Sequence, residues 1–122
     1  MNNQEAFDIA AKHLLTQNKQ SARPIDGRCL YRGPNGLMCA VGALIPDELY
    51  EARFEVYTAD ELTTPFAQKR EIAKYFKGVD PGLLSHLQNI HDRFKPEEWA
   101  ELLIDCAECF GLNSVWILEY KK

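Results

Sequence analysis

The sequence predicts a mainly α fold, with four to five helices around one core and a small hairpin or two-stranded ribbon beside them. Apolar residues recur at helical spacing in several separate stretches. Capping residues or prolines precede most of these stretches, and glycine follows two of them. At 122 residues the chain is long enough for one core, so we expect a single globular domain over residues 1–122.

The first helix is expected from Asn2 to about Asn18. Asn2 followed three residues later by Glu5 is the pattern of a capping box, in which each residue binds the other's backbone N–H. The inward face then follows the helical period, through Phe7, Ala10, Ala11, Leu14 and Leu15. Residues 18–27 have the composition of a loop.

The central stretch, CLYRGPNGLMCAVGALIPDELY at residues 29–50, predicts a hairpin that leads into a buried segment. Residues 28–36 are expected to form a strand and a tight turn, with Pro34 suited to the second position of a type I turn. Residues 37–45 are apolar throughout and fit a buried helix or a buried strand. We favour a helix because Ala and Gly are poor strand formers. Gly42 in such a segment indicates close approach by a neighbouring backbone.

The C-terminal half predicts three further helices after an acidic region of short helical turns at residues 47–63. The first is capped by Thr64 and closed by Gly78, and the second starts at Asp80-Pro81. The third runs from Pro96 to Phe110, with Gly111 as its stop. The apolar tail VWILEY at residues 115–120 is expected to be a strand that pairs with CLYR.

Composition excludes several function classes. No apolar run approaches the roughly 18 residues of a membrane span, and the N-terminus lacks a basic and then apolar signal, so we expect a cytoplasmic protein with no membrane partner. The four cysteines are then expected to be reduced. A net charge of −4 makes nucleic acid a poor partner. There is no P-loop, G-x-G-x-x-G or G-x-S-x-G pattern, so no cofactor is predicted.

One short motif points to cysteine chemistry. Residues 26–32, Asp-Gly-Arg-Cys-Leu-Tyr-Arg, resemble the nucleophile loop of the ovarian-tumour-type deubiquitinases. The resemblance implies a cysteine hydrolase that uses Cys29, with Asp26 beside it and a distant histidine as base, for which His91 is the candidate. However, the Gly-Pro-Asn-Gly turn at residues 33–36 stops any helix one turn after Cys29. We therefore favour Cys29 as a small buried residue on a hairpin.

Metal binding is the next possibility. Cys106 and Cys109 have the two-residue spacing of zinc ligands, and Cys29 and Cys39 could supply a second pair. Those two are too far apart in sequence for a zinc knuckle, and packing already explains Cys106, so we predict no metal site. His91-Asp92 resembles a metal-phosphohydrolase dyad, but such sites need more ligands than three histidines supply. We expect His91 to hydrogen-bond a neighbouring loop from the edge of its helix's buried face.

Over most of its length the chain also resembles a set of small proteins from bacteriophages and prophages. The shared pattern is HLL at residues 13–15, the central stretch at 29–50, LQNIHD at 87–92, and a Trp-bearing helix that ends in Gly-Leu at 111–112. The resemblance implies a phage context and a bacterial host. Small phage proteins without catalytic residues often act by binding a host or defence protein.

The last long helix suggests how such binding would occur. Acidic residues follow one another at steps of four, four and three, with a further one beside them, and the helix contains no Lys or Arg. The set is Glu97, Glu98, Glu101, Asp105 and Glu108. We therefore expect a non-enzymatic protein that binds and modulates a basic host or defence protein through this acidic surface. The alternatives are the Cys29 hydrolase and a nucleic-acid binder that uses Arg70, Lys74 and Lys77, which share one helical face.

Overall fold

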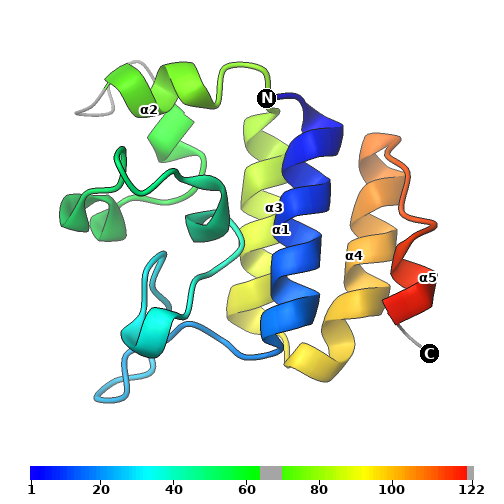
Figure 1. Cartoon of the computed structure of the whole chain (residues 1–122), viewed down its shortest axis with the longest axis horizontal. Coiled ribbons are helices and arrows are strands. Elements are labelled where there is room, and N and C mark those ends of the chain that lie inside the picture. Colours follow the sequence, from blue (N-terminus) through cyan, green and yellow to red (C-terminus); the bar gives the residue numbers. More distant parts are fainter. Residues whose placement is uncertain (64–69, 121–122) are drawn as a thin grey trace.

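The computed structural model is mainly helical and describes residues 1–63 and 70–120. In this part of the chain the α-helices are α1 (Asn3–Gln17), α2 (Arg70–Tyr75), α3 (Pro81–Arg93), α4 (Pro96–Phe110) and α5 (Ile117–Tyr120). The helices α1, α3 and α4 pack against one another as a bundle (Figure 1). The irregular segment at residues 19–63 lies on one side of α1 and α3, whereas α4 and α5 lie on the other. The predicted mainly α fold is confirmed.

The bundle helices begin and end where local signals place them. The Asn2 side chain accepts a hydrogen bond from the Glu5 N–H at 2.8 Å, and the Glu5 carboxylate accepts one from the Asn2 N–H at 3.2 Å. Asp80 caps α3 by accepting from the Gly82 N–H at 2.8 Å. Gly111 ends α4 in the left-handed conformation with φ of 67°. Each of these contacts satisfies a backbone group that the helix itself leaves unpaired.

The core lies inside the bundle and extends beneath the irregular segment. The largest fully buried side chains come from all three bundle helices, from α2 and from the segment. They include Phe7 and Leu14 of α1, Leu83, Leu84, Leu87 and Ile90 of α3, Trp99 and Leu103 of α4, Ile72 and Phe76, and Phe54 and Leu62. The predicted inward faces of α1, α3 and α4 are thus largely confirmed.

The helix predicted over residues 37–45 is wrong, although much of this stretch is buried as expected. Only Gly42–Leu44 forms one turn of 3₁₀-helix. The Cys39 N–H donates to the Tyr31 carbonyl at 3.3 Å, and the Val41 N–H donates to Gln88 Oε1 at 3.2 Å. These partners lie outside the stretch, so its backbone is satisfied without forming a helix.

The close approach predicted at Gly42 is confirmed. A Cβ at this position would lie 2.7 Å from the carbonyl carbon of Tyr31 and closer still to its oxygen. No side chain larger than hydrogen fits there without moving the backbone of residue 31.

The hairpin is reduced to two isolated antiparallel bridges, Ala22 with Cys29 and Arg32 with Met38. The described residues contain no strand of consecutive pairs. The turn is not type I, because Asn35 has φ of 59° where type I requires a negative value. Asn tolerates this left-handed conformation better than most residues.

The C-terminal tail is also not a strand. Residues 117–120 form the short helix α5 against α4, and the Trp116 indole donates to the Asp8 carboxylate of α1 at 3.0 Å. The acidic region contains the short 3₁₀ turns Ala52–Val56 and Glu61–Thr63, as predicted. The predicted cap at Thr64 lies outside the described residues. No helix in the described part of the chain is long and apolar enough to cross a membrane.

Candidate functional site

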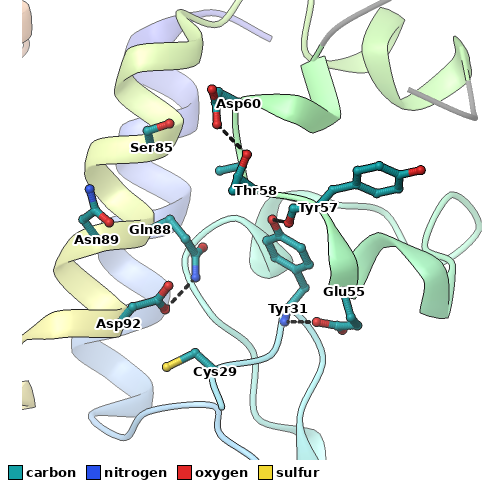
Figure 2. A pocket seen from close by; sticks show the side chains of 11 residues that line it. Cys29, Tyr31, Glu55, Tyr57, Thr58, Asp60, Ser85, Gln88, Asn89 and Asp92 are labelled. Atoms are coloured by element: carbon teal, nitrogen blue, oxygen red, sulfur yellow. Dashed lines mark hydrogen bonds between the residues drawn. The ribbon is translucent and has the colours of Figure 1, made fainter. Parts of the chain in front are cut away.

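A polar pocket of about 360 Å³ lies between α3 and the irregular segment. Ser85, Gln88, Asn89 and Asp92 of α3 form one wall, because their spacing of three, one and three places them on one helix face. Figure 2 shows residues of the segment on the other side of the pocket, with Cys29 close to Asp92. These residues are Cys29, Tyr31, Glu55, Tyr57, Thr58, Ala59 and Asp60.

Hydrogen bonds accepted by the Glu55 carboxylate and one donated by the Tyr31 hydroxyl fix the wall that the segment forms. The Glu55 carboxylate accepts from the N–H of Tyr31 at 2.8 Å, from the N–H of Arg32 at 3.1 Å and from the Tyr50 hydroxyl at 2.5 Å. The Tyr31 hydroxyl donates to the Tyr57 carbonyl at 2.6 Å. Together these bonds connect residues 31–32 with residues 50–57 and hold this wall of the pocket in place.

Cys29 and Asp92 line one end of the pocket, and the buried His91 lies behind them in a cluster of three possible ligands. Their thiol, imidazole and carboxylate ligand atoms all lie within 4.8 Å of one another. His91 is fully buried, and its ring stacks on Trp99 at a centroid distance of 5.7 Å. The two residues that the deubiquitinase resemblance singled out in distant parts of the sequence, Cys29 and His91, are therefore neighbours. Asp26 is not with them, because it pairs with Arg23 in an exposed turn.

The hydrogen bonds of His91 determine what this cluster can do. The backbone N–H of Ser21 donates to His91 Nε2 at 2.9 Å. Because that N–H can only donate, Nε2 carries the lone pair, and the proton of the neutral ring is on Nδ1. Nδ1 in turn lies 2.7 Å from Asp92 Oδ1. The basic nitrogen of His91 is thus occupied by the loop, as the sequence predicted for this residue.

This arrangement differs from that of an activated cysteine. Burial, together with the neighbouring Asp92 carboxylate, raises the pKa of the Cys29 thiol to about 12. A cysteine nucleophile instead needs a cationic neighbour or a helix N-terminus that lowers its pKa. The residues around Cys29 supply a carboxylate and a neutral imidazole, which favour the protonated thiol.

The hydrogen bonds of His91 also disfavour metal binding at this cluster. A metal ion on Nδ1 of His91 would have to displace the proton on that nitrogen while Nε2 still accepts from Ser21. A metal ion on Nε2 would break the hydrogen bond from the Ser21 N–H. Cys29, His91 and Asp92 supply three ligand types suited to zinc, but the ring is oriented for a structural bond. Cys39, Cys106 and Cys109 belong to no group of three potential metal ligands among the described residues. Cys39 and Cys106 are buried, and Cys109 is exposed.

The acidic surface predicted on the last long helix lies on α4. The α4 surface consists of the five predicted acidic residues, and all five are exposed: Glu97, Glu98, Glu101, Asp105 and Glu108. The opposite face of α4 is buried through Trp99, Leu103, Cys106 and Ala107. The Glu98 carboxylate also accepts a bond from the Lys95 N–H at 3.0 Å, so this residue contributes to the start of the helix.

The basic residues considered for nucleic acid lie on α2 and in the turn that follows it. Lys74 on α2 and Lys77 in that turn are exposed, and Glu71 on α2 is exposed as well. The backbone of Arg70 begins α2, while its side chain lies outside the described part. Two exposed lysines beside an exposed glutamate leave little net positive charge for contacts with phosphates.

Sequence reasoning missed the pocket itself. The signal was present, because Ser85, Gln88, Asn89 and Asp92 are polar at helical spacing opposite the apolar face of α3. A polar helix face usually means solvent, so nothing local distinguishes a face that lines a cavity. Glu55 could not be singled out among the acidic residues of the region, because its partners are backbone groups more than twenty residues away.

Comparison of the chain with protein-family models, curated proteins and solved structures finds no match.

Proposed function

We propose that this protein is a non-enzymatic binding protein that engages a basic partner through the α4 surface. The phage resemblance makes a host or defence protein the expected partner, and binding would modulate its activity. The observation that carries the proposal is the exposure of five carboxylates on one helix that contains no Lys or Arg. The chemistry around Cys29 supports a binding role over a hydrolase, since the thiol is kept protonated.

The distribution of charge along α4 is not explained by helix stability. Glu97 and Glu98 are stabilised by the positive end of the helix dipole, whereas Asp105 and Glu108 lie toward the negative end. Like charges at a spacing of four residues also destabilise a helix by about 0.2–0.5 kcal/mol per pair. The α4 surface is thus wholly acidic although its like charges destabilise the helix. Such a surface attracts basic proteins and accelerates their association.

The experiment is affinity capture from a bacterial lysate with three forms of the protein. The test variant replaces Glu101 and Asp105 by lysine, and the control variant replaces the exposed Glu48 and Glu71 by lysine. Both double variants change the net charge by the same amount, so only the location of the charge differs. Basic proteins retained by the wild type and the control variant, but lost from the α4 variant, are the expected result.

The captured protein is then purified and its association measured at several salt concentrations. Reversal on α4 should slow association and weaken its salt dependence, because steering by the carboxylates is removed. Equal capture by the α4 variant and the wild type would contradict the proposal, as would equal loss from both double variants.

A further inference from the structure

The polar pocket between α3 and residues 29–60 is a second feature that the α4 surface does not explain. It is separated from α4 by the α1–α3 pair, so the two lie on different sides of the molecule (Figure 1). Its volume of about 360 Å³ lies in the range of small-ligand sites. Its wall is fixed by the Glu55 and Tyr31 bonds rather than formed by exposed side chains alone.

The lining has a single sign of charge. Glu55, Asp60 and Asp92 contribute carboxylates, and none of the lining residues is a Lys, Arg or His. Glu55 is committed to its three donors from residues 31, 32 and 50. Asp60 accepts a hydrogen bond from the Thr58 hydroxyl at 2.7 Å, and Asp92 accepts from Gln88 and His91 beside the Cys29 thiol. Each of these two carboxylates has further oxygen lone pairs that can accept from a ligand.

Asp60 appears at the level of Ser85 in Figure 2, toward the end of the pocket opposite Asp92, which lies next to Cys29. The helical rise from residue 85 to residue 92 is about 10 Å, which sets the length of the polar wall. At the Asp92 end, Gln88 Nε2 and His91 Nδ1 both bond Oδ1, at 2.8 and 2.7 Å. The second oxygen, Oδ2, has no nitrogen donor among the described residues.

We propose that this pocket binds an elongated aliphatic polyamine, with one ammonium group at Asp92 and another toward Asp60. Ammonium groups are donors only, and the side chains between the two carboxylates, Ser85 and Asn89, offer a hydroxyl and an amide oxygen that can accept. A chain of the length of spermidine spans the wall, whereas a compact dication cannot reach both ends. The same chemistry is carried by a lysine side chain of another protein, and the test separates these two sources.

The test is an NMR titration of the full chain with spermidine, observed at the side-chain amide signals of Gln88 and Asn89. We expect saturable shifts with a dissociation constant on the order of 1 mM or lower. Butylamine, which has one ammonium group, should bind at least about tenfold more weakly, since it loses one charge-assisted contact. A peptide with a single lysine between glycines tests the protein-borne source, and tighter binding of that peptide than of spermidine would overturn the assignment to a free polyamine.

Matched variants locate the binding. Asp92→Asn keeps an acceptor oxygen for Gln88 and His91 but removes the charge, and it should weaken spermidine binding by about tenfold or more. Asp105→Asn removes the same charge from the α4 surface and should change the affinity less than about twofold. Asp60→Asn should weaken spermidine binding while leaving that of butylamine unchanged.

Three results would overturn the proposal. The first is the absence of saturable shifts at Gln88 and Asn89 with spermidine at about ten times the expected dissociation constant. The second is equal weakening by Asp92→Asn and Asp105→Asn, which would indicate attraction to the overall charge. The third is an equal response to magnesium chloride, which would indicate a compact cation site. None of these results depends on whether α4 binds a protein.

Discussion

The helical bundle and the irregular segment at residues 19–63 are stabilised by different kinds of hydrogen bond. In the bundle, backbone groups are paired within each helix and the ends are closed by neighbours in sequence, such as Asn2 with Glu5. In the segment, backbone groups bind side chains or carbonyls far away in sequence, such as Val41 with Gln88 and Ser21 with His91. Changes in the bundle should therefore act locally, whereas changes in the segment should act on several loops together.

Cysteine reactivity should show the largest contrast. Cys29 is in the segment, and its burial against α3, together with the neighbouring Asp92 carboxylate, raises the pKa of its thiol to about 12. Cys109 is exposed on α4. Alkylation of the native protein by iodoacetamide at pH 7.5, followed by mass spectrometry, should be slower at Cys29 than at Cys109 by on the order of a hundredfold.

Asp92→Asn should raise the alkylation rate of Cys29, because it removes the carboxylate that disfavours the thiolate, and should leave Cys109 unchanged. If Cys29 reacts faster than Cys109 in the wild type, the thiol is activated and the cysteine hydrolase becomes the better interpretation.

A glycine-to-alanine substitution should destabilise the segment much more than the bundle. Gly42→Ala places a methyl group against the backbone of Tyr31 and should lower the free energy of unfolding by about 3 kcal/mol. Gly82→Ala in the first turn of α3 meets only side chains, Asp80 Oδ1 at 3.2 Å and Phe110 Cζ at 3.8 Å, so its effect should stay within about 1 kcal/mol of the wild type. Urea unfolding followed by circular dichroism measures both, and wild-type stability of the Gly42 variant would refute the close approach.

Glu55 provides a test of how the segment is held. Glu55→Ala removes the acceptor of two backbone N–H groups and one hydroxyl and should lower the free energy of unfolding by about 2 kcal/mol. Near-ultraviolet circular dichroism should change because Tyr31 and Tyr50 lose a common partner, while far-ultraviolet helix signals persist. Glu48→Ala, at an exposed position of the same region, is the control and should have little effect.

The smallest effect is expected at a helix cap. Asn2→Ala removes the acceptor of the Glu5 N–H and should lower the free energy of unfolding by about 1 kcal/mol. Asn2→Asp places a carboxylate oxygen where the amide oxygen accepts this bond, so its free energy of unfolding should stay close to that of the wild type. Hydrogen exchange should show faster opening confined to the first turn of α1, and accelerated exchange throughout residues 19–63 would argue against a local effect.

The starts of α1, α3 and α4 and the ends of α1 and α4 were predictable because their signals are local. A capping residue, a proline or a left-handed glycine acts on backbone groups within four positions, so sequence spacing alone contains the relevant geometry. The exposed acidic residues of the α4 surface were predictable for the same reason, since helical periodicity separates them from Trp99 and Leu103. The sequence also predicted that a neighbouring backbone approaches Gly42 closely, but it did not predict that this backbone is that of Tyr31.

Tertiary structure alone decided the course of residues 37–45, the tail at 115–120 and the polar pocket. For the first two, local sequence preferences do not decide between helix, strand and irregular structure, and partners distant in sequence select the conformation. These partners are Gln88 and Tyr31 for residues 37–45, and α1 and α4 for the tail. The proximity of Cys29, His91 and Asp92 is of the same kind, because more than sixty positions in the sequence separate the cysteine from the α3 pair. The sequence by itself determined the three bundle helices α1, α3 and α4 and the faces that they bury. The environment of the Cys29 thiol, and a pocket lined by carboxylates, arise only when the segment packs on α3, because their geometry depends on contacts between residues remote in the chain.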